Sequence, residues 1–236
     1  NLTALKAVWA DASHRRADVV LFLGDLVAFG PEPKATLEYM RDEIAPAVAL
    51  RGNTDRYLLD KVWEDADCSL PDWVQKSLKW SAKKIGKRGL KYLAELSEET
   101  VHSIEGLDTY LCHATPGNDE LGVVAGKQHE LGSVFSGVEA DVVLCGHTHL
   151  PLRTAIDGTP VLNVGSVGFP YDRDPRACYV SFMVGGGSLQ ELSFSRTSFN
   201  LYESIRKLEE SGMPGADVMV HRLRTASNTR PKSASA

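Results

Sequence analysis

The chain has 236 residues, of which 43% are hydrophobic, and its 26 basic and 31 acidic residues give a formal net charge of −5. This length and composition fit one domain with a substantial core. The acidic balance argues against generic binding to nucleic acids, whose phosphates attract basic surfaces, although a nucleotide-like small molecule stays open as a substrate. No apolar run reaches the roughly 18 residues that a membrane span needs, so we expect a cytoplasmic protein without membrane contact.

The cysteines Cys68, Cys112, Cys145 and Cys178 are widely spaced and include no CxxC pair. This pattern argues against a zinc ribbon and against a dense disulfide framework. We therefore expect reduced, buried thiols.

The first quarter of the chain alternates helical and strand-like patterns. Residues 1–16 carry apolar side chains at helical spacing and predict an amphipathic helix. Residues 19–23 form a short, continuous apolar run, which is typical of a strand buried on both faces. A second helix is predicted over 33–43, and a second buried strand over 45–50.

The middle of the chain predicts a helical region followed by two more buried strands. Residues 59–96 have helical periodicity and indicate two or three helices that cap the sheet, one of which starts at Pro71. The apolar runs that follow cover 110–112 and 141–146.

Gly-rich turns separate three further strands, which favours a meander in a second sheet; these strands are 160–164, 177–182 and 189–194. A helix over 199–211 is predicted to stop at Gly212. The polar tail 226–236 is predicted to be disordered, so a single domain covers 1–225.

Four of the apolar runs are followed by polar residues, namely Asp25, Asn53, His113 and His147. In open α/β sheets, ligands bind beyond the carboxyl ends of the strands, so we expect these four side chains to share one rim. Each residue alone has an ordinary structural interpretation: the aspartate can form a turn, and a histidine can be a structural residue whose hydrogen bonds are all made. Their shared position favours a metal site, because carboxylate, amide and imidazole donors suit manganese, iron, nickel or zinc.

The segment Gly146-His147-Thr148-His149 is the sharpest of these signals. Two neutral imidazoles, two residues apart after a buried strand, can face a pair of ions from one loop. An exposed pair of histidines is common by accident, so the segment gains its meaning from the other three positions.

These segments together resemble the calcineurin-like metallophosphoesterases, and within them the small bacterial and archaeal branch that includes the YfcE-type phosphodiesterases. The segments that carry the resemblance are 24–27, 52–55, 112–116, 146–149 and 163–168. The resemblance implies an α/β fold, a four-layer α/β/β/α sandwich of two mixed sheets flanked by helices. It also implies the metal ligands: Asp25 bridges two ions, Asn53, His113 and His147 bind the second, and His149 binds the first. Asp55 would support the Asn53 loop from outside the ligand shell.

The chain departs from the family pattern in two places. The family opens with a strand that ends in Asp-x-His, and this sequence starts at the point just after that motif, so we expect upstream residues to supply it; an incomplete first metal site is the alternative. Thr54 stands where many relatives have a histidine that protonates the leaving oxygen. General acids contribute about 10²- to 10⁴-fold, so its replacement favours phosphodiesters or activated esters over simple monoesters.

The expected reaction is hydrolysis of a small phosphoester by a hydroxide held between two divalent ions. Arg56, Arg173 and Arg176 are candidates for neutralising substrate charge, although a surface salt bridge is the favoured interpretation of each. Two alternatives remain open: a catalytically impaired binding or scaffold protein with this fold, and a mononuclear hydrolase of amides or lactones. Metal identity and a homo-oligomeric state are not determined by the sequence.

Overall fold

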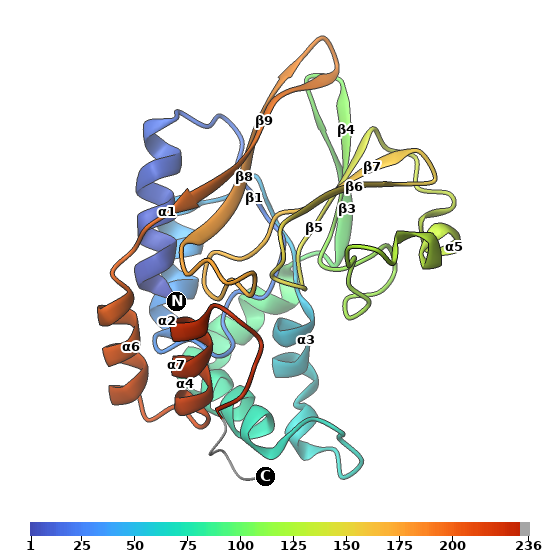
Figure 1. The fold of residues 1–236 in the computed structure, drawn as a ribbon. Coiled ribbons are helices and arrows are strands. Elements are labelled where there is room, and N and C mark those ends of the chain that lie inside the picture. The colour runs from blue at the N-terminus through green and yellow to red at the C-terminus, as the bar shows by residue number, and fades with distance from the viewer. Residues whose placement is uncertain (232–236) are drawn as a thin grey trace.

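The structure, a computed structural model, describes residues 1–231. Seven α-helices run along the chain (Figure 1): α1 (Leu2–His14), α2 (Pro33–Tyr39), α3 (Asn53–Asp60), α4 (Asp72–Glu95), α5 (Gly132–Phe135), α6 (Leu201–Glu210) and α7 (Ala216–Thr225). The nine strands within residues 1–231 are β1 (Leu21–Phe22), β2 (Val48–Ala49), β3 (Glu99–Ile104), β4 (Leu107–Cys112), β5 (Val142–Cys145), β6 (Leu152–Ile156), β7 (Thr159–Asn163), β8 (Ala177–Gly185) and β9 (Ser188–Thr197). Short turns complete the set, one π-helical at Met40–Ile44 and two 3₁₀ at Val62–Glu64 and Gln128–Glu130.

The strands form one large sheet and two small ones. The five-stranded sheet has the order β3-β4-β5-β7-β6, with β4, β5 and β7 parallel and the two edge strands antiparallel to their neighbours. Strands β1 and β2 pair in parallel, and β8 and β9 form an antiparallel hairpin. Because β1, β2, β4 and β5 each lie in a parallel pair, each pair delivers the residues after its strands to one edge.

Three apolar clusters join the sheets and helices of the core. One apolar cluster joins Leu23 and Leu50, next to β1 and β2, to Leu111 and Leu144 of the large sheet, and Phe182 of β8 packs against it. A second cluster places α1, α2 and α4 on the outer side of β1 and β2, and a third places α5 on the far side of the large sheet. The predicted mixed α/β sandwich is therefore confirmed, with helices on both outer faces.

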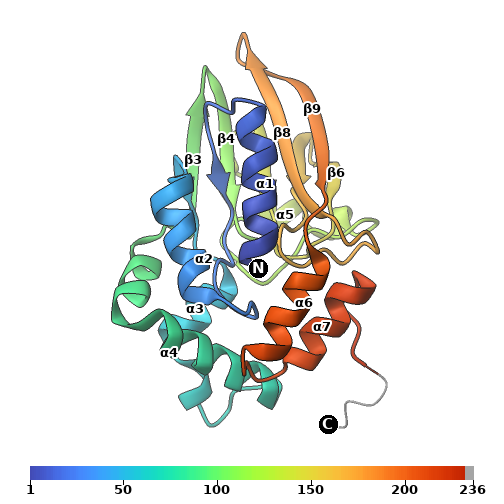
Figure 2. The same ribbon diagram turned by 90° about the vertical axis from the view of Figure 1, so that its left-hand side faces the viewer.

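The C-terminal helices close one end of the molecule. Figure 2 shows α6 and α7 beside the lower end of α1, below the β8–β9 hairpin. Their apolar side chains form a cluster with Phe169 and Tyr171 of the preceding loop and with Trp73 of α4. This cluster brings α7 next to a loop that, as described below, contacts the candidate site.

Several local predictions were wrong in detail. Strand β7 does not belong to a meander with β8 and β9, because it pairs with β5 and β6 in the large sheet. The helical region begins at Asn53 and not near 59, and α4 is two helices joined at Gly86, whose φ of 64° and ψ of −172° are not helical. Strands β3 and β6 and helix α7 were not predicted at all.

Other predictions were closer. Asn1 caps α1 by accepting a hydrogen bond from the backbone nitrogen of Ala4, and Pro71 precedes α4 as expected. Cys112, Cys145 and Cys178 are buried and unpaired, whereas Cys68 is only half-buried. The start of the predicted tail is packed, since Ala226 is buried and its carbonyl accepts a hydrogen bond from the Arg173 nitrogen; residues 232–236 lie outside the described part. Among residues 1–231, no helix is long and apolar enough to cross a membrane.

Candidate metal centre

Four side chains from four strand ends meet at one point of the rim. The Asn53 Oδ1 atom lies 3.1 Å from His113 Nε2 and 3.2 Å from His147 Nδ1. The Asp25 Oδ2 atom lies 3.3 Å from the same His113 nitrogen. Asp25 follows β1, Asn53 follows β2, His113 follows β4 and His147 follows β5. The structure thus brings together the four residues that the sequence placed on one rim.

These distances fit the coordination shell of one divalent ion. With metal–ligand bonds of roughly 2.1 Å, neighbouring ligand atoms around an ion lie roughly 3.0–3.4 Å apart. One ligand atom each from Asp25, His113 and His147 falls within a group whose members are all within 4.8 Å of one another. The mixed oxygen and nitrogen donors suit a borderline transition metal, so the residues present fit such an ion.

Hydrogen bonds orient the histidine ring of His113 for this role. Its Nδ1 donates to the Leu23 carbonyl at 2.7 Å, which directs Nε2 toward Asp25 and Asn53. Burial alone would lower the pKa of His113, but the Asp25 carboxylate outweighs it and raises the pKa to about 9. Burial would raise the pKa of Asp25, whereas His113 and the two donors of Thr54 hold it below its usual value. The carboxylate is therefore charged at neutral pH, as a metal ligand must be.

The loop that carries His147 and His149 has a strained backbone. Both residues have left-handed φ angles, 66° and 60°, and Asp25 has a φ of 60°. Such conformations are costly for residues other than glycine and concentrate at functional sites. Asn163 fixes the loop, because its Nδ2 donates to the Thr148 hydroxyl at 2.9 Å and to the Gly146 carbonyl at 2.5 Å.

His149 lies beside the cluster and has its own support. Its Nδ1 donates to the Phe169 carbonyl at 2.6 Å, and its ring stacks on Tyr171 with centroids 4.6 Å apart and planes at 14°. Burial lowers the pKa of His149 and also that of His147, so both imidazoles are neutral near pH 7. His149 is not part of the three-residue group at 4.8 Å, and its predicted place on a separate ion stays a prediction.

Two glycines allow the Asp25 and Asn53 loops to touch. A Cβ atom on Gly52 would lie 2.2 Å from Asp25 Oδ1, and one on Gly24 would lie 2.6 Å from the Gly52 nitrogen. Any side chain at either position would push the loops apart. Glycine is thus required at both positions, because the loops that carry Asp25 and Asn53 approach each other closely there.

Asp55 and Thr54 hold these donors in place. The buried Asp55 carboxylate accepts hydrogen bonds from Leu26 N at 3.0 Å and from Gly52 N at 3.1 Å, so it ties the two loops together. Burial and the nearby Asp25 charge raise its pKa. Thr54 donates to Asp25 Oδ1 through its nitrogen at 3.0 Å and its hydroxyl at 2.7 Å. The second Asp25 oxygen is left to face His113.

Comparison with known proteins places this geometry in a family. Residues 1–185 match the family model described as the calcineurin-like phosphoesterase superfamily domain. The chain belongs to the calcineurin-like phosphoesterase superfamily. The superfamily predicted from the sequence motifs is therefore confirmed, and the cluster at the rim lies within the matched residues.

Relatives of the chain match nearly its whole length. A metallophosphoesterase from Sphaerobacter thermophilus is 25% identical, with a TM-score of 0.75 over 96% of this chain and 94% of that one. A hypothetical protein from Pyrococcus horikoshii OT3 is 19% identical, with a TM-score of 0.83 over 98% and 95%. An uncharacterized protein from Methanocaldococcus jannaschii is 26% identical over 91% of this chain and 90% of its own length.

The three arginines proposed for substrate binding lie in different surroundings. Arg56 is bound by Asp119, at 2.7 and 2.9 Å, and by Glu120 at 2.7 Å. Arg176 is exposed and pairs with Asp174, and Arg173 is also exposed. Arg56 and Arg176 already have carboxylate partners, and contact of any of the three with substrate stays a prediction.

One feature near the site, Arg222, was missed in the sequence. Arg222 of α7 lies 5.6 Å from the ring centroid of Tyr171 and 5.5 Å from that of Trp73, and its Nη1 donates to the Tyr171 hydroxyl at 3.3 Å. Because Tyr171 stacks on His149, Arg222 is linked to that histidine through the tyrosine. No local pattern marks Arg222, because the contact joins positions more than 50 residues apart.

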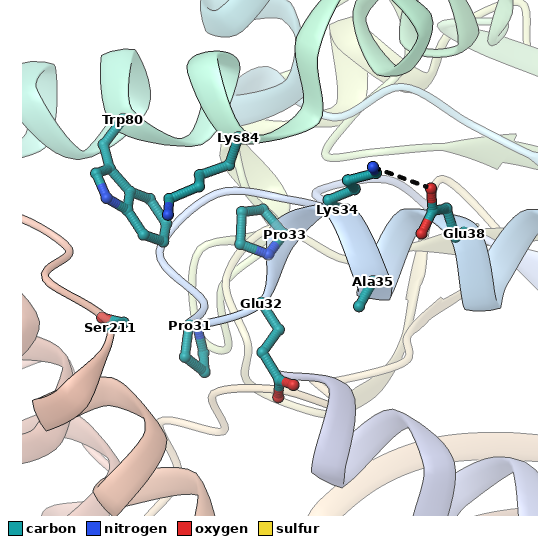
Figure 3. Close-up of a pocket in the computed structure, with 9 residues that line it drawn as sticks. All are labelled: Pro31, Glu32, Pro33, Lys34, Ala35, Glu38, Trp80, Lys84 and Ser211. Carbon is teal, nitrogen blue, oxygen red and sulfur yellow. Dashed lines mark ion pairs between the residues drawn. The ribbon is translucent and has the colours of Figure 1, made fainter.

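A hollow of about 440 Å³ lies elsewhere on the surface (Figure 3). Trp80 and Lys84 of α4 line it on one side and Pro31 and Pro33 on the other, and Lys34 pairs with Glu38 at 3.8 Å. None of its lining residues belongs to the candidate metal site.

Proposed function

We propose that the chain hydrolyses phosphoesters with two divalent metal ions, and that it prefers diesters or activated esters to simple monoesters. The observation that carries this proposal is the meeting of Asp25, Asn53, His113 and His147 at ligand-to-ligand distances of 3.1–3.3 Å. Membership in the phosphoesterase superfamily supports the reaction class. Manganese, iron, nickel and zinc all suit the donor set.

We take the ligand set from the resemblance to the superfamily, and the cluster of Asp25, Asn53, His113 and His147 supports it. We assign Asn53, His113 and His147 to one ion, His149 to the other, and Asp25 to both. Bound ions of this kind activate water and neutralise charge on the attacking and leaving oxygens. The chain's own residues orient the ligands: Leu23 fixes the His113 ring, Phe169 fixes the His149 ring, and Thr54 fixes one Asp25 oxygen.

The preference for diesters is supported by the surroundings of Thr54. Its hydroxyl already donates to Asp25 at 2.7 Å, so it faces the carboxylate and not a leaving group. A substrate whose leaving oxygen needs no proton, such as an aryl ester, therefore loses least from the missing general acid.

The test begins with removal of metal by a chelator and its restoration as Mn²⁺, Ni²⁺ or Zn²⁺, followed by assays of aryl diesters and aryl monoesters. We expect metal-dependent turnover that is higher on the diester. His147→Ala should lose at least about 10²-fold in kcat/KM, in keeping with the loss of a metal-activated group. His129→Ala, a change at an exposed histidine outside the cluster, is the matched control. Equal activity of the two variants would defeat the proposal.

A second experiment examines leaving-group dependence. Rates across a series of aryl diesters should fall steeply as the leaving group becomes more basic, because no protein acid assists it. Thr54→His should flatten that dependence. A flat dependence in the unmodified protein would show that another residue donates the proton.

A further inference from the structure

Three exposed apolar side chains lie on loops beside the candidate metal cluster, and we call Leu121, Val124 and Leu150 the apolar rim. Among residues 1–231, the large apolar side chains with the greatest exposure are Val101, Leu121, Val124, Leu150, Met183 and Tyr202. Three of these six belong to two loops at the site: Leu121 and Val124 are 42% and 38% exposed, and Leu150 is 36% exposed. Apolar side chains scattered singly need no explanation, but a group beside a polar site does.

The two loops touch at the metal-binding histidine. A Cβ atom on Gly122 would lie 2.4 Å from Thr148 Cγ2 and 3.1 Å from His147 Cδ2, so the loop around Gly122 packs directly on His147 and Thr148. Leu121 adjoins Gly122 in sequence. Leu150 follows two residues after Thr148, and its nitrogen donates to the Thr148 hydroxyl at 3.3 Å. Leu121 and Leu150 therefore lie within two residues of one contact at the cluster, each on its own loop.

Anchors outside the rim hold its loop in this position. Asn118 Oδ1 accepts hydrogen bonds from Glu120 N at 2.9 Å and from Leu121 N at 2.8 Å. Val123 is 1% exposed and fixes the segment between the two exposed side chains. Because the backbone is held in this way, Leu121 and Val124 cannot both turn into the core. The exposure is a property of the fold, and a preformed apolar surface binds at a lower entropic cost than a mobile one.

Charges near the rim favour an uncharged group. Asp119 and Glu120 are the nearest acidic residues on the same loop, and Arg56 is engaged by both. That arginine is therefore not free to hold a second phosphate, as a nucleotide di- or triphosphate would require. With a phosphoester bound to the cluster, the organic group on the phosphorus must lie over the adjoining surface.

We infer that Leu121, Val124 and Leu150 form a subsite for an apolar organic group, aryl or alkyl, of the phosphoester that the metal cluster binds. This inference rests on the proposed function and adds a substrate class to it. Apolar contact with a preformed surface makes phenyl esters better ligands than methyl esters of the same phosphate.

Two p-nitrophenyl diesters with the same leaving group provide the test, one with a phenyl and one with a methyl second ester. The metal-loaded protein should favour the phenyl ester in kcat/KM. Leu121→Gln combined with Leu150→Gln should reduce kcat/KM on the phenyl ester about 5- to 20-fold and on the methyl ester less than about 2-fold, with the change mainly in KM. Val101→Gln, at a 49% exposed position of β3, is the matched control and should change neither.

Binding measurements separate this inference from the proposed function. Calorimetry with phenylphosphonate and methylphosphonate should show a phenyl preference that the double variant loses, even if no ester is hydrolysed. Absence of metal-dependent turnover with a retained phenyl preference would defeat the hydrolase proposal and keep the subsite. Equal binding of the two phosphonates, or an equal loss of both in the double variant, would overturn the subsite.

Discussion

The carboxylate of Asp55 accepts a hydrogen bond from the backbone nitrogen of Leu26, 29 positions earlier, at 3.0 Å. It also accepts one from Gly52 N, so a single buried side chain joins the loop of Asp25 to the loop of Asn53. Neither bond involves a metal-donor atom. The spacing of the two loops, and with it the geometry of the cluster, therefore depends on a residue behind the ligands.

Asp55→Asn should lower both stability and metal affinity. The amide group would face one backbone N–H with another N–H donor, which leaves a buried donor unsatisfied at a cost of about 1–3 kcal/mol in the free energy of unfolding. Urea unfolding of the metal-free protein measures this cost, and titration of metal measures the second effect. Asp60→Asn, at an exposed ion pair on the same helix, should change stability by less than about 1 kcal/mol. Similar losses in both variants would contradict the assigned role.

Gly52→Ala tests the close approach of the loops. Gly52 has a φ of −91°, which alanine adopts freely, so the expected damage comes from the clash of the new Cβ with Asp25 and with the His113 ring. We expect a loss of about 1–3 kcal/mol in the free energy of unfolding and a loss of metal binding.

The control for this variant is Gly212→Ala, between α6 and α7. Its φ of 68° is unfavourable for alanine, but no atom lies within 4 Å of the added Cβ. It should cost roughly 1–2 kcal/mol through strain alone and keep full metal affinity. Retained metal binding in Gly52→Ala would show that the loops can separate without harm.

The sequence predicted the site better than it predicted the sheets. Asp25 and His147 follow continuous apolar runs, and such runs identify strands buried on both faces without any knowledge of their partners. Strands β3 and β6 are edge strands. Most of their residues alternate between exposed and half-buried positions, so no continuous apolar run marks these strands in the sequence. The pairing of β7 with β5 is a long-range contact, which turn patterns next to β7 do not encode.

The same limit applies to residues that support the site from a distance. The role of Asn53 could be predicted because this residue follows a buried apolar run at the end of one strand. Arg222 acts on Tyr171 from another helix, 51 positions later, and only the packing of α7 brings the two together. Local patterns predict donors at strand ends, whereas their supports come from tertiary packing.

Metal uptake should release a proton from His113. The pKa of this residue is raised from 6.5 to about 9 in the metal-free protein, mainly because Asp25 outweighs the effect of burial. The protonated ring therefore stabilises the metal-free fold fully below pH 6.5, and this contribution is lost as the pH rises through 9. A metal ion needs the unprotonated Nε2 and must displace this proton.

Calorimetric titration of metal in buffers of different ionisation enthalpy measures the release. About one proton should leave per protein molecule near neutral pH, when the ion that His113 binds is taken up, and the number should fall toward zero as the pH rises through 9. His147, whose pKa is lowered, should contribute no proton in this range. Uptake without proton release near pH 7 would show that His113 is not a ligand.

Tyr171 should position His149. Its ring lies 4.6 Å from the imidazole at an angle of 14°, and it is held from behind by Arg222. Tyr171→Ala removes the surface against which the imidazole packs, leaving only the hydrogen bond to Phe169 to fix its orientation. Loss of such an outer support typically lowers metal affinity about 10- to 100-fold.

Tyr171→Phe separates the ring from its hydroxyl. It keeps the stack on His149 and loses only the hydrogen bond from Arg222 to the hydroxyl group. A single hydrogen bond that does not touch the metal ligands contributes about 1 kcal/mol or less. We therefore expect metal affinity within about 3-fold of the unmodified protein. Metal titration of the two variants, together with a thermal melt of each metal-free protein, compares the effects. If the ring positions His149, the Ala variant loses affinity in excess of any loss of stability, and the Phe variant does not. Equal affinities in the two variants would mean that Phe169 alone sets the orientation of the imidazole.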